Sequence, residues 1–279
     1  MKKSLKNALK RLIDGPVFLM DRFAAGRYFM GRITAQVMGL TRTIAHGDVH
    51  LIFAAPNELA RARASTFSTK EPETLEWIDA IPTKSILWDI GANVGIYTCY
   101  AAKARQCRVF AFEPSVFNLE LLARNVALNG LADRVSIVPL PLSETTALSQ
   151  LNMSSVDWGG AMSTFGQDYG HDGRALSKIF EYPTLGLSMT DAMNVLKIPR
   201  PDYIKMDVDG IEHLILKGGA PVLAGVKGVL IEINDEFAAQ AGEANELLRR
   251  AGLTLKEKRH ADVRLTGGSE TTFNQIWVR

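Results

Sequence analysis

Cysteine is scarce in this chain, since only Cys99 and Cys107 occur in 279 residues. One pair cannot form the dense disulfide framework that stabilises small secreted domains, and it favours a reduced, cytoplasmic protein. The five histidines are scattered, and no Cys/His spacing typical of a four-ligand zinc site occurs. The composition therefore excludes a disulfide scaffold and a zinc module.

Long apolar runs are also missing. The first apolar stretch is interrupted at residues 14–16 and again by Asp21 and Arg22, so no spanning helix or secretory signal is expected. The formal net charge is only +2, and no Lys/Arg patch alternates with aromatic residues. We therefore expect no nucleic acid partner. With 47% hydrophobic residues, the chain is long enough for one substantial domain and an extension.

Residues 86–98 predict a strand, a tight glycine turn and a helix. The apolar run Ile86-Leu87-Trp88 leads into Asp89, and Gly91 and Gly95 follow, with Asn93 between them. Glycines at such a turn allow positive φ angles and a close approach of a nucleotide to the backbone. We predict that Asp89, Gly91, Asn93 and Gly95 bind a cofactor, and that a side chain at Gly95 would occupy ligand space.

The glycine spacing favours one nucleotide ligand over another. A dinucleotide site has G-x-G-x-x-G and places the pyrophosphate on a helix N-terminus, whereas here the spacing is G-x-x-x-G and the strand ends in Asp89. A carboxylate repels phosphate but attracts the ammonium of S-adenosylmethionine (SAM). SAM is therefore preferred to NAD, although an NAD-type oxidoreductase and a turn without a ligand role stay open.

Polar residues follow each of the next apolar runs, and the carboxyl ends of parallel strands meet at one rim where ligands bind. Glu113 comes about 24 residues after Asp89, where an acid can accept hydrogen bonds from ribose hydroxyls. Ser143 is expected beside an adenine edge; for both, a solvated turn residue is the alternative. The predicted strands, each with the polar residue near its end, are 108–112 with Glu113, 134–140 with Ser143, 201–210 with Asp207, and 228–234 with Asn234.

Several of these blocks together resemble the FkbM-type SAM-dependent methyltransferases. They are W-D-I-G-A-N-V-G-I-Y-T, A-F-E-P-S, I-K-M-D-V-D-G-I-E-H and V-L-I-E-I-N, collinear from about Lys70 to Asn234. The resemblance implies a class I methyltransferase fold, an α/β Rossmann-like sheet of seven strands with an antiparallel last strand, and methyl transfer, usually to a hydroxyl oxygen. It also implies that Glu71 faces the pocket. Asp209 departs from the Glu that is more usual in the third of these blocks.

Two regions flank this pattern. Residues 253–257 and 273–278 alternate like half-buried strands across a connection containing Gly267 and Gly268, which predicts a terminal antiparallel hairpin. Residues 1–80 are expected to form a helical and hairpin extension to a SAM-binding domain of residues 81–279, with the hairpin at residues 41–54.

The first helix of that extension is basic and amphipathic. Lys2, Lys3, Lys6, Lys10 and Arg11 alternate with leucines and an isoleucine between positions 5 and 13. Such a helix could bind an anionic membrane surface peripherally, or it could pack on the protein's own surface.

Residues 151–187 lie between the third and fourth strands and mix aromatic residues with glycines without clear periodicity. Loops this long inside a compact domain are usually functional. We interpret the segment as a substrate lid in which Trp158 and Tyr169 stack on a sugar or another ring. Ordinary loop packing is the alternative.

The predicted reaction is SAM-dependent O-methylation of a hydroxyl on a sugar, glycan or small metabolite. A hydroxyl nucleophile must lose its proton, and Asp207 is the leading general base, with Lys205 as its electrostatic neighbour and His213 as a substitute. The alternatives are an NAD-type oxidoreductase and a non-catalytic SAM-fold binding module. Mg²⁺ held by Asp207, Asp209, Glu212 and Asn234 is a minor alternative. The methyl acceptor and the oligomeric state are not predicted.

Overall fold

The computed structural model describes residues 3–260 and 271–279, and the side chains from residue 12 onward. The predicted connection at Gly267 and Gly268 and the residue Lys2 lie outside the described residues. The helices are α1 (Lys3–Asp21), α2 (Ala24–Met38), α3 (Glu58–Ser65), α4 (Phe67–Lys70), α5 (Pro72–Ala80), α6 (Ile96–Ala104), α7 (Val116–Leu128), α8 (Met189–Asn194), α9 (Glu212–Lys217), α10 (Ala220–Leu223) and α11 (Ala238–Arg250). The strands are β1 (Thr41–His46), β2 (Val49–Ala54), β3 (Ile86–Ile90), β4 (Arg108–Phe112), β5 (Val135–Val138), β6 (Leu142–Ser143), β7 (Ala147–Met153), β8 (Ser163–Phe165), β9 (Phe180–Ser188), β10 (Tyr203–Met206), β11 (Gly228–Asn234), β12 (Thr254–Arg259) and β13 (Thr272–Val278).

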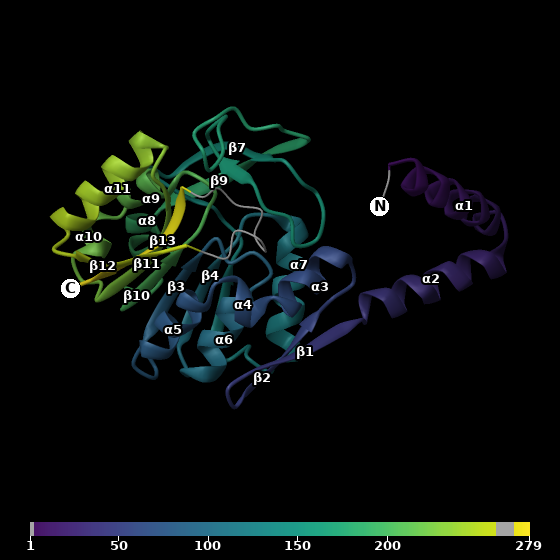
Figure 1. Cartoon of the computed structure of the whole chain (residues 1–279), viewed down its shortest axis with the longest axis horizontal. Coiled ribbons are helices and arrows are strands. Elements are labelled where there is room, and N and C mark those ends of the chain that lie inside the picture. The colour runs from purple at the N-terminus through teal and green to yellow at the C-terminus, as the bar shows by residue number, and fades with distance from the viewer. Residues whose placement is uncertain (1–2, 261–270) are drawn as a thin grey trace.

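The main sheet has seven strands in the order β12-β13-β11-β10-β3-β4-β5. The five strands β5, β4, β3, β10 and β11 are parallel, whereas β13 runs antiparallel to both β11 and β12. The predicted seven-stranded α/β Rossmann-like sheet with an antiparallel last strand is therefore confirmed (Figure 1). The order reverses between β3 and β10, and their carboxyl ends frame the crevice where such sheets bind ligands.

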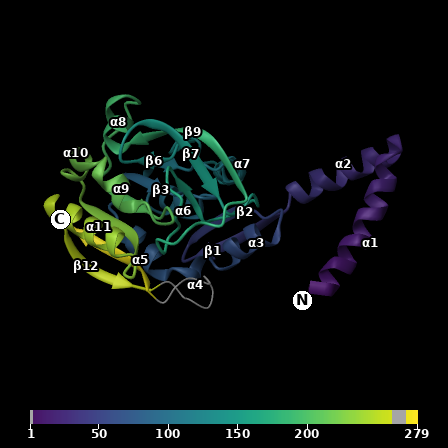
Figure 2. The same ribbon diagram turned by 90° about the horizontal axis from the view of Figure 1, so that it is seen from above.

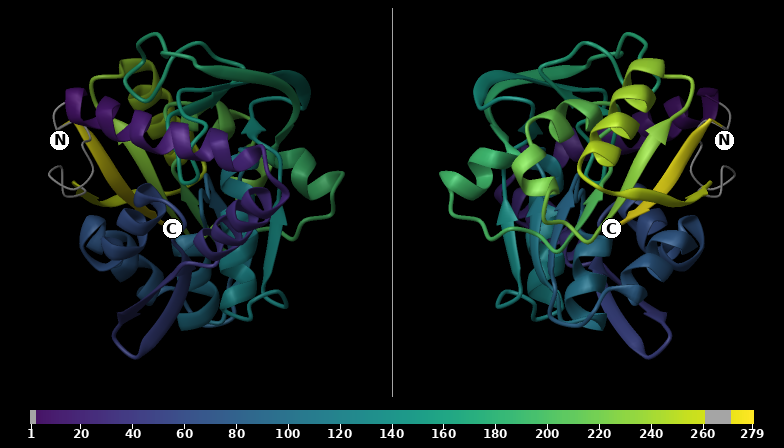
Figure 3. Two further views of the ribbon diagram at one scale, coloured as in Figure 1. Left: turned by 90° about the vertical axis from the view of Figure 1, so that its right-hand side faces the viewer. Right: turned by 90° about the vertical axis from the view of Figure 1, so that its left-hand side faces the viewer.

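Helices cover both faces of this sheet (Figure 3), and a hydrophobic layer lies under the helices on each face. On one face, Leu87 and Val109 pack with residues of α5, α6 and α7. On the other, Trp88 and Met206 pack with residues of α8 to α11. Successive side chains of a strand point to opposite faces, so a strand buried on both sides reads as a continuous apolar run, as residues 86–88 do.

A second, smaller sheet with the order β6-β9-β7-β8 lies within residues 142–188. The prediction of a loop at residues 151–187 is wrong where this segment contains the end of β7, β8 and most of β9, and β7 pairs with β9 over seven residues. The buried large apolar side chains of this segment are Leu151, Met153, Phe165 and Leu187. The apolar alternation is therefore too short and too irregular to predict strands from the sequence.

Residues 41–80 belong structurally to the body of the molecule. The predicted hairpin at residues 41–54 is confirmed as the antiparallel pair β1 and β2. Phe53, Phe67 and Ile78 from β2, α4 and α5 share one core with the sheet residue Leu87. The boundary at residue 80 remains a prediction, and the clearest change in packing occurs near Gly39, where α2 ends.

The helices α1 and α2 project from the body as an arm, which we define as residues 3–38 (Figures 1 and 2). Helix α1 contacts α2 and does not lie along the body, so packing on the protein's own surface is not what the structure shows. Across residues 3–260 and 271–279, no helix is long and apolar enough to cross a membrane.

Candidate functional site

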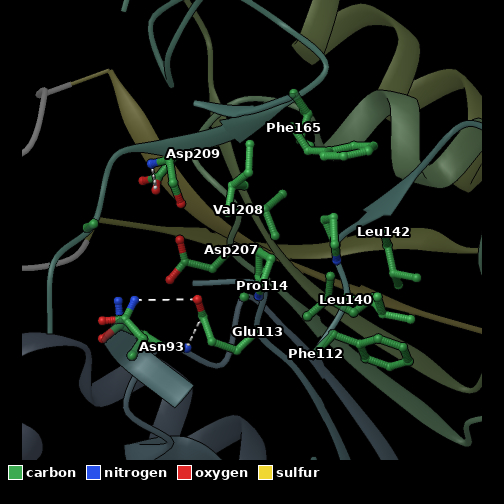
Figure 4. Close-up of a pocket in the computed structure, with 18 of the residues that line it drawn as sticks. Asn93, Phe112, Glu113, Pro114, Leu140, Leu142, Phe165, Asp207, Val208 and Asp209 are labelled. Carbon is green, nitrogen blue, oxygen red and sulfur yellow. Dashed lines mark hydrogen bonds between the residues drawn. The ribbon is translucent and has the colours of Figure 1, made fainter. Parts of the chain in front are cut away.

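A cavity opens at the carboxyl ends of β3, β4 and β10, where the predicted rim lies (Figure 4). One wall carries carboxylates and amides, and the other carries apolar side chains that form a slot. The lining residues include Gly91, Asn93, Glu113, Asn118, Asp207 and Asp209 on the polar side, and Phe112, Leu140, Leu142, Leu151 and Phe165 on the apolar side.

Glu113 lies at the tip of β4, as predicted, and it is almost completely buried. Its Oε2 accepts a hydrogen bond from the backbone N–H of Asn93 at 2.8 Å, and its Oε1 accepts one from Ser115 N–H at 2.9 Å. Burial raises the pKa of Glu113 to about 7 although these bonds lower it. The carboxylate is therefore fixed in position and sensitive to pH near neutrality.

Two asparagines connect the rim to the segment that covers it. Asn93 Nδ2 and Asn118 Nδ2 both donate to the carbonyl oxygen of Gly160, at 2.7 and 3.1 Å. Asn93 itself has a φ of 51°, a left-handed conformation that asparagine tolerates better than most residues. Asn118 was not predicted as a site residue, because its position in α7 reads only as a polar residue in an amphipathic helix.

Asp209 holds the covering segment from the opposite side. Its Oδ2 accepts hydrogen bonds from Met162 N–H at 2.8 Å and from Ser163 N–H at 3.2 Å. Burial and the neighbouring Asp207 raise the pKa of Asp209 to about 6. We define residues 158–163 as the lid. Contacts separated by more than 40 residues in the chain position it over the cavity.

The two glycines of the turn have steric roles that the sequence interpretation missed. A Cβ on Gly91 would lie 1.9 Å from the carbonyl oxygen of Asp207, and a Cβ on Gly95 would lie 2.3 Å from Leu122 Cδ1. Both glycines also have positive φ angles, of 81° and 78°. The expectation that a side chain at Gly95 would occupy ligand space is therefore wrong, because α7 occupies that space.

Lys205 lies at the centre of a buried ionic cluster on β3 and β10. Its Nζ is 3.7 Å from Asp89 Oδ1 and 3.5 Å from Asp207 Oδ2. Burial opposes the charge, but Asp207 and Asp89 hold the pKa of Lys205 above its usual value. The lysine side chain therefore stays protonated.

The two aspartates of this cluster differ in exposure. Asp89 is 1% exposed, and its Oδ2 accepts a hydrogen bond from Thr98 at 2.5 Å, so its partners are side chains of the protein and it is absent from the cavity lining. Asp207 retains 31% side-chain exposure and lines the cavity. Although burial acts in the other direction, Lys205, Lys70 and Arg63 hold the pKa of Asp207 below its usual value.

Glu71 and Glu232 extend this cluster beneath α4 and α5. Glu71 is buried and accepts hydrogen bonds from Lys70 Nζ at 2.7 Å and from Thr74 Oγ1 at 3.3 Å. Glu232 lies two residues beyond Leu230, the β11 partner of Lys205, and so faces the same side of the sheet. Burial and Asp207 raise the pKa of Glu232 well above its usual value. Glu232 was not predicted as a site residue.

Other predicted site residues lie away from the cavity. Ser143 pairs with Ser188 in the smaller sheet, and the wall ends one residue earlier, at Leu142. His213 is buried in α9 with its ring 5.8 Å from that of Phe237, and burial lowers its pKa. His213 does not line the cavity, and its ring lies beside Phe237 at the start of α11, so the structure gives no support for His213 as a substitute base.

The predicted stacking residues also have other partners. Tyr169 packs edge-on against Phe237 at 5.3 Å, and Trp158 packs against the core layer of α5 to α7. Phe112 and Phe165 are the aromatic rings that line the cavity. Neither Trp158 nor Tyr169 lines this cavity, and their stacking on a substrate stays a prediction.

The oxygen ligands considered for Mg²⁺ do not converge. Glu212 accepts hydrogen bonds from Val208 N–H and Gly210 N–H, both at 3.1 Å, and Asn234 Oδ1 accepts one from Glu236 N–H. Within the described part of the chain, no group of three or more His, Cys, Asp or Glu side chains could hold a metal ion.

A family model described as the methyltransferase FkbM domain matches residues 89–255 of this chain. The chain belongs to the FkbM methyltransferase family. The matched segment contains the glycine turn after β3, the lid and the cavity residues Glu113, Asp207 and Asp209, so the cavity of this FkbM protein lies within the family domain.

Two curated relatives carry methyltransferase names. The chain is similar to "Hexuronic acid methyltransferase AglP" of Haloferax volcanii, with 28% identity over 171 residues, which are 61% of this chain and 64% of the relative. It is similar to "Methyltransferase sdnD" of Sordaria araneosa, with 33% identity over 66 residues, which are 23% and 26% of the two chains. The chain thus spans less than two thirds of the length of either relative.

Among solved structures, the crystal structure described as methyltransferase FkbM from Methylobacillus flagellatus KT aligns with a TM-score of 0.47 and 16% identity. The alignment covers 80% of this chain and 55% of that one.

Proposed function

We propose that this protein is a SAM-dependent O-methyltransferase whose acceptor is an acidic sugar. The observation that carries the proposal is the cavity at the carboxyl ends of β3, β4 and β10, in which Glu113 and Asp207 lie inside the segment matched by the FkbM family. The name of the Haloferax relative supports a hexuronic acid acceptor.

The residues of the cavity fit SAM. The Glu113 carboxylate is of the right type to accept hydrogen bonds from ribose hydroxyls, and the slot between Phe112, Leu140 and Leu142 suits a flat purine ring. Asp89 would act through Lys205 and Thr98 and would not contact the ligand itself. Bound SAM supplies an electrophilic methyl group for an in-line displacement.

The charges near Asp207 favour an acidic acceptor. Lys70 and Arg63 are half-exposed cations that act electrostatically on Asp207, and a hexuronic acid carries a carboxylate that such cations attract. The protein aligns the acceptor oxygen and excludes water beneath the lid. Asp207 is the proposed acceptor of a hydroxyl proton, and Glu232, with its raised pKa, is the second candidate for that role.

The low pKa of Asp207 also favours a second reaction at the same site. A carboxylate with a depressed pKa is a weak base. A strong base is not needed if the methyl acceptor is the sugar carboxylate, because an ionised carboxylate has no proton to lose. The product would then be a methyl ester. Methylation of a hydroxyl gives a methyl ether and methylation of the carboxylate gives a methyl ester, and both are products of O-methylation.

Calorimetry and product analysis test the proposal. The full chain should bind SAM and S-adenosylhomocysteine and should not bind NAD, and it should methylate glucuronic acid more rapidly than glucose. An alkali-stable product indicates an ether formed at a hydroxyl, and an alkali-labile product indicates an ester. NAD binding without a response to SAM would support the oxidoreductase alternative. SAM binding without methylation of either sugar would support a non-catalytic module.

A further inference from the structure

The arm exposes an unusual amount of apolar surface. Phe18, Phe23 and Tyr28 are 68%, 61% and 73% exposed. The other large apolar residues that are exposed between Leu12 and Leu40 are Leu12, Ile13, Val17, Leu19, Met20, Phe29, Ile33, Val37 and Leu40. Exposed apolar side chains are normal when they are scattered singly, but a continuous set on one element indicates an interaction surface.

No part of the described body covers this surface. Helix α2 has no buried residue, and the two helices extend away from the sheet (Figure 2). The apolar residues therefore do not contribute to the two core layers that stabilise the fold.

The charge of this region differs in sign from that of the body. Residues 1–38 contain eight lysines and arginines and two aspartates, a net charge of +6, whereas the whole chain has +2. Residues 39–279 therefore carry −4. Arg22, Arg27 and Arg32 interrupt the apolar residues of the arm, and the Arg22 guanidinium lies 5.5 Å from the Phe18 ring centre. Basic and aromatic residues on one helical element are typical of helices that lie in a bilayer interface.

We propose that the arm binds the anionic surface of a lipid bilayer and tethers the methyltransferase body to it. Clustered lysines and arginines are attracted to anionic headgroups, and the apolar side chains would enter the boundary with the acyl chains. A second copy of the arm is a poorer partner, because it would bring the same positive charge. The negative body would be repelled by the same membrane, so the contact is confined to the arm.

Vesicle co-sedimentation of the full chain tests the proposal. Vesicles of phosphatidylcholine and phosphatidylglycerol should bind the protein, and vesicles of phosphatidylcholine alone should bind it at least about tenfold more weakly. Binding to the anionic vesicles should fall strongly between low and high salt. Equal binding to both kinds of vesicle, or binding to neither, overturns the proposal.

Substitutions in the arm separate charge from apolar contact. The triple variant Arg22→Gln, Arg27→Gln, Arg32→Gln should weaken binding to anionic vesicles by roughly 100-fold, and Phe18→Ser with Phe23→Ser should weaken it at least about tenfold. Leu148→Ser is the matched control, because Leu148 is 76% exposed on the body and should not affect vesicle binding. Unchanged binding in both arm variants overturns the proposal.

Light scattering without lipid tests whether a second copy of the chain, and not a bilayer, covers the apolar surface of the arm. If the full chain forms a dimer that the two arm variants break, and the vesicles bind none of these proteins, the arm is an interface between two copies and the membrane proposal fails. The unfolding midpoint and SAM binding should be unchanged in every arm variant, because no core residue is altered.

Discussion

The arm and the body place similar residues in opposite environments. In the body, Trp88 and Phe112 are at most 1% exposed, whereas Phe18, Phe23 and Tyr28 of the arm are mostly exposed. Burying one large apolar side chain contributes about 1.5–3 kcal/mol to folding, and the arm does not use this contribution. The difference teaches that the apolar residues of the body stabilise its fold, while those of the arm stay exposed and are available to contact the proposed lipid bilayer. Substitutions in the arm should therefore leave folding and methyl transfer unchanged, and substitutions in the body should leave vesicle binding unchanged.

The largest expected effect is at Asp207. Asp207→Asn should lower turnover on a hydroxyl acceptor by about 10²- to 10⁴-fold, because the amide cannot accept the proton, while vesicle binding through the arm stays unchanged. Asp133→Asn is the control, since Asp133 is 71% exposed on the body. A fully active Asp207→Asn variant would assign Asp207 to structure and would direct attention to Glu232.

The pH profile distinguishes the two carboxylates. The pKa of Asp207 is held below its usual value by Lys205, Lys70 and Arg63 against the effect of burial. At saturating SAM, a reaction based on Asp207 should therefore have a turnover rate that is flat from about pH 5 upward. Burial and Asp207 raise the pKa of Glu232, so a reaction based on Glu232 should become faster as the pH rises through that raised value.

The next largest effect concerns folding of the body at Gly95. Gly95→Ala and Gly130→Ala both place a side chain at a positive φ, but Gly95 meets Leu122 whereas Gly130 has no atom within 4 Å. Both variants should lose about 1–2 kcal/mol to backbone strain, and Gly95→Ala should lose roughly 1–3 kcal/mol more through overpacking. Urea unfolding measures both. Equal losses would show that α7 adjusts to the new methyl group.

A smaller effect is expected for ligand binding at Glu113. Glu113→Ala should weaken SAM by about 1–3 kcal/mol, the cost of losing hydrogen bonds to a charged acceptor, as calorimetry would show. Glu120→Ala is the control, because Glu120 lies on α7 and pairs with Arg124 at the surface. Unchanged affinity in Glu113→Ala would place the ribose contact elsewhere.

The pKa of about 7 gives Glu113 a second signature. Burial raises this pKa from 4.5, so between these values the folded protein binds more protons than the unfolded chain, and the contribution of Glu113 to stability falls as the pH rises. Ribose hydroxyls donate to the ionised form, so SAM affinity should increase from about pH 5 to pH 7. Glu113→Gln should remove both slopes. A wild-type affinity that is constant over this range would contradict the prediction.

The sequence predicted the sheet and one wall of the cavity because those features depend on local patterns. The apolar runs that end in Glu113 and Asp207, with glycines after Asp89, predict parallel strands whose carboxyl ends meet at one rim. The terminal hairpin followed from alternation alone. These patterns extend over fewer than ten residues each, so neighbouring residues determine them.

The tertiary structure decided the partners of these residues. Asp89 pairs with Lys205 and Thr98, Gly95 meets Leu122, and Asp209 holds the lid, and each of these contacts joins separate elements of the fold. The sequence by itself determined which strands of the main sheet form and which end of each carries polar groups. Only the folded chain decided which carboxylates face the cavity, because a side chain's direction depends on strand pairing and on the helices packed above it.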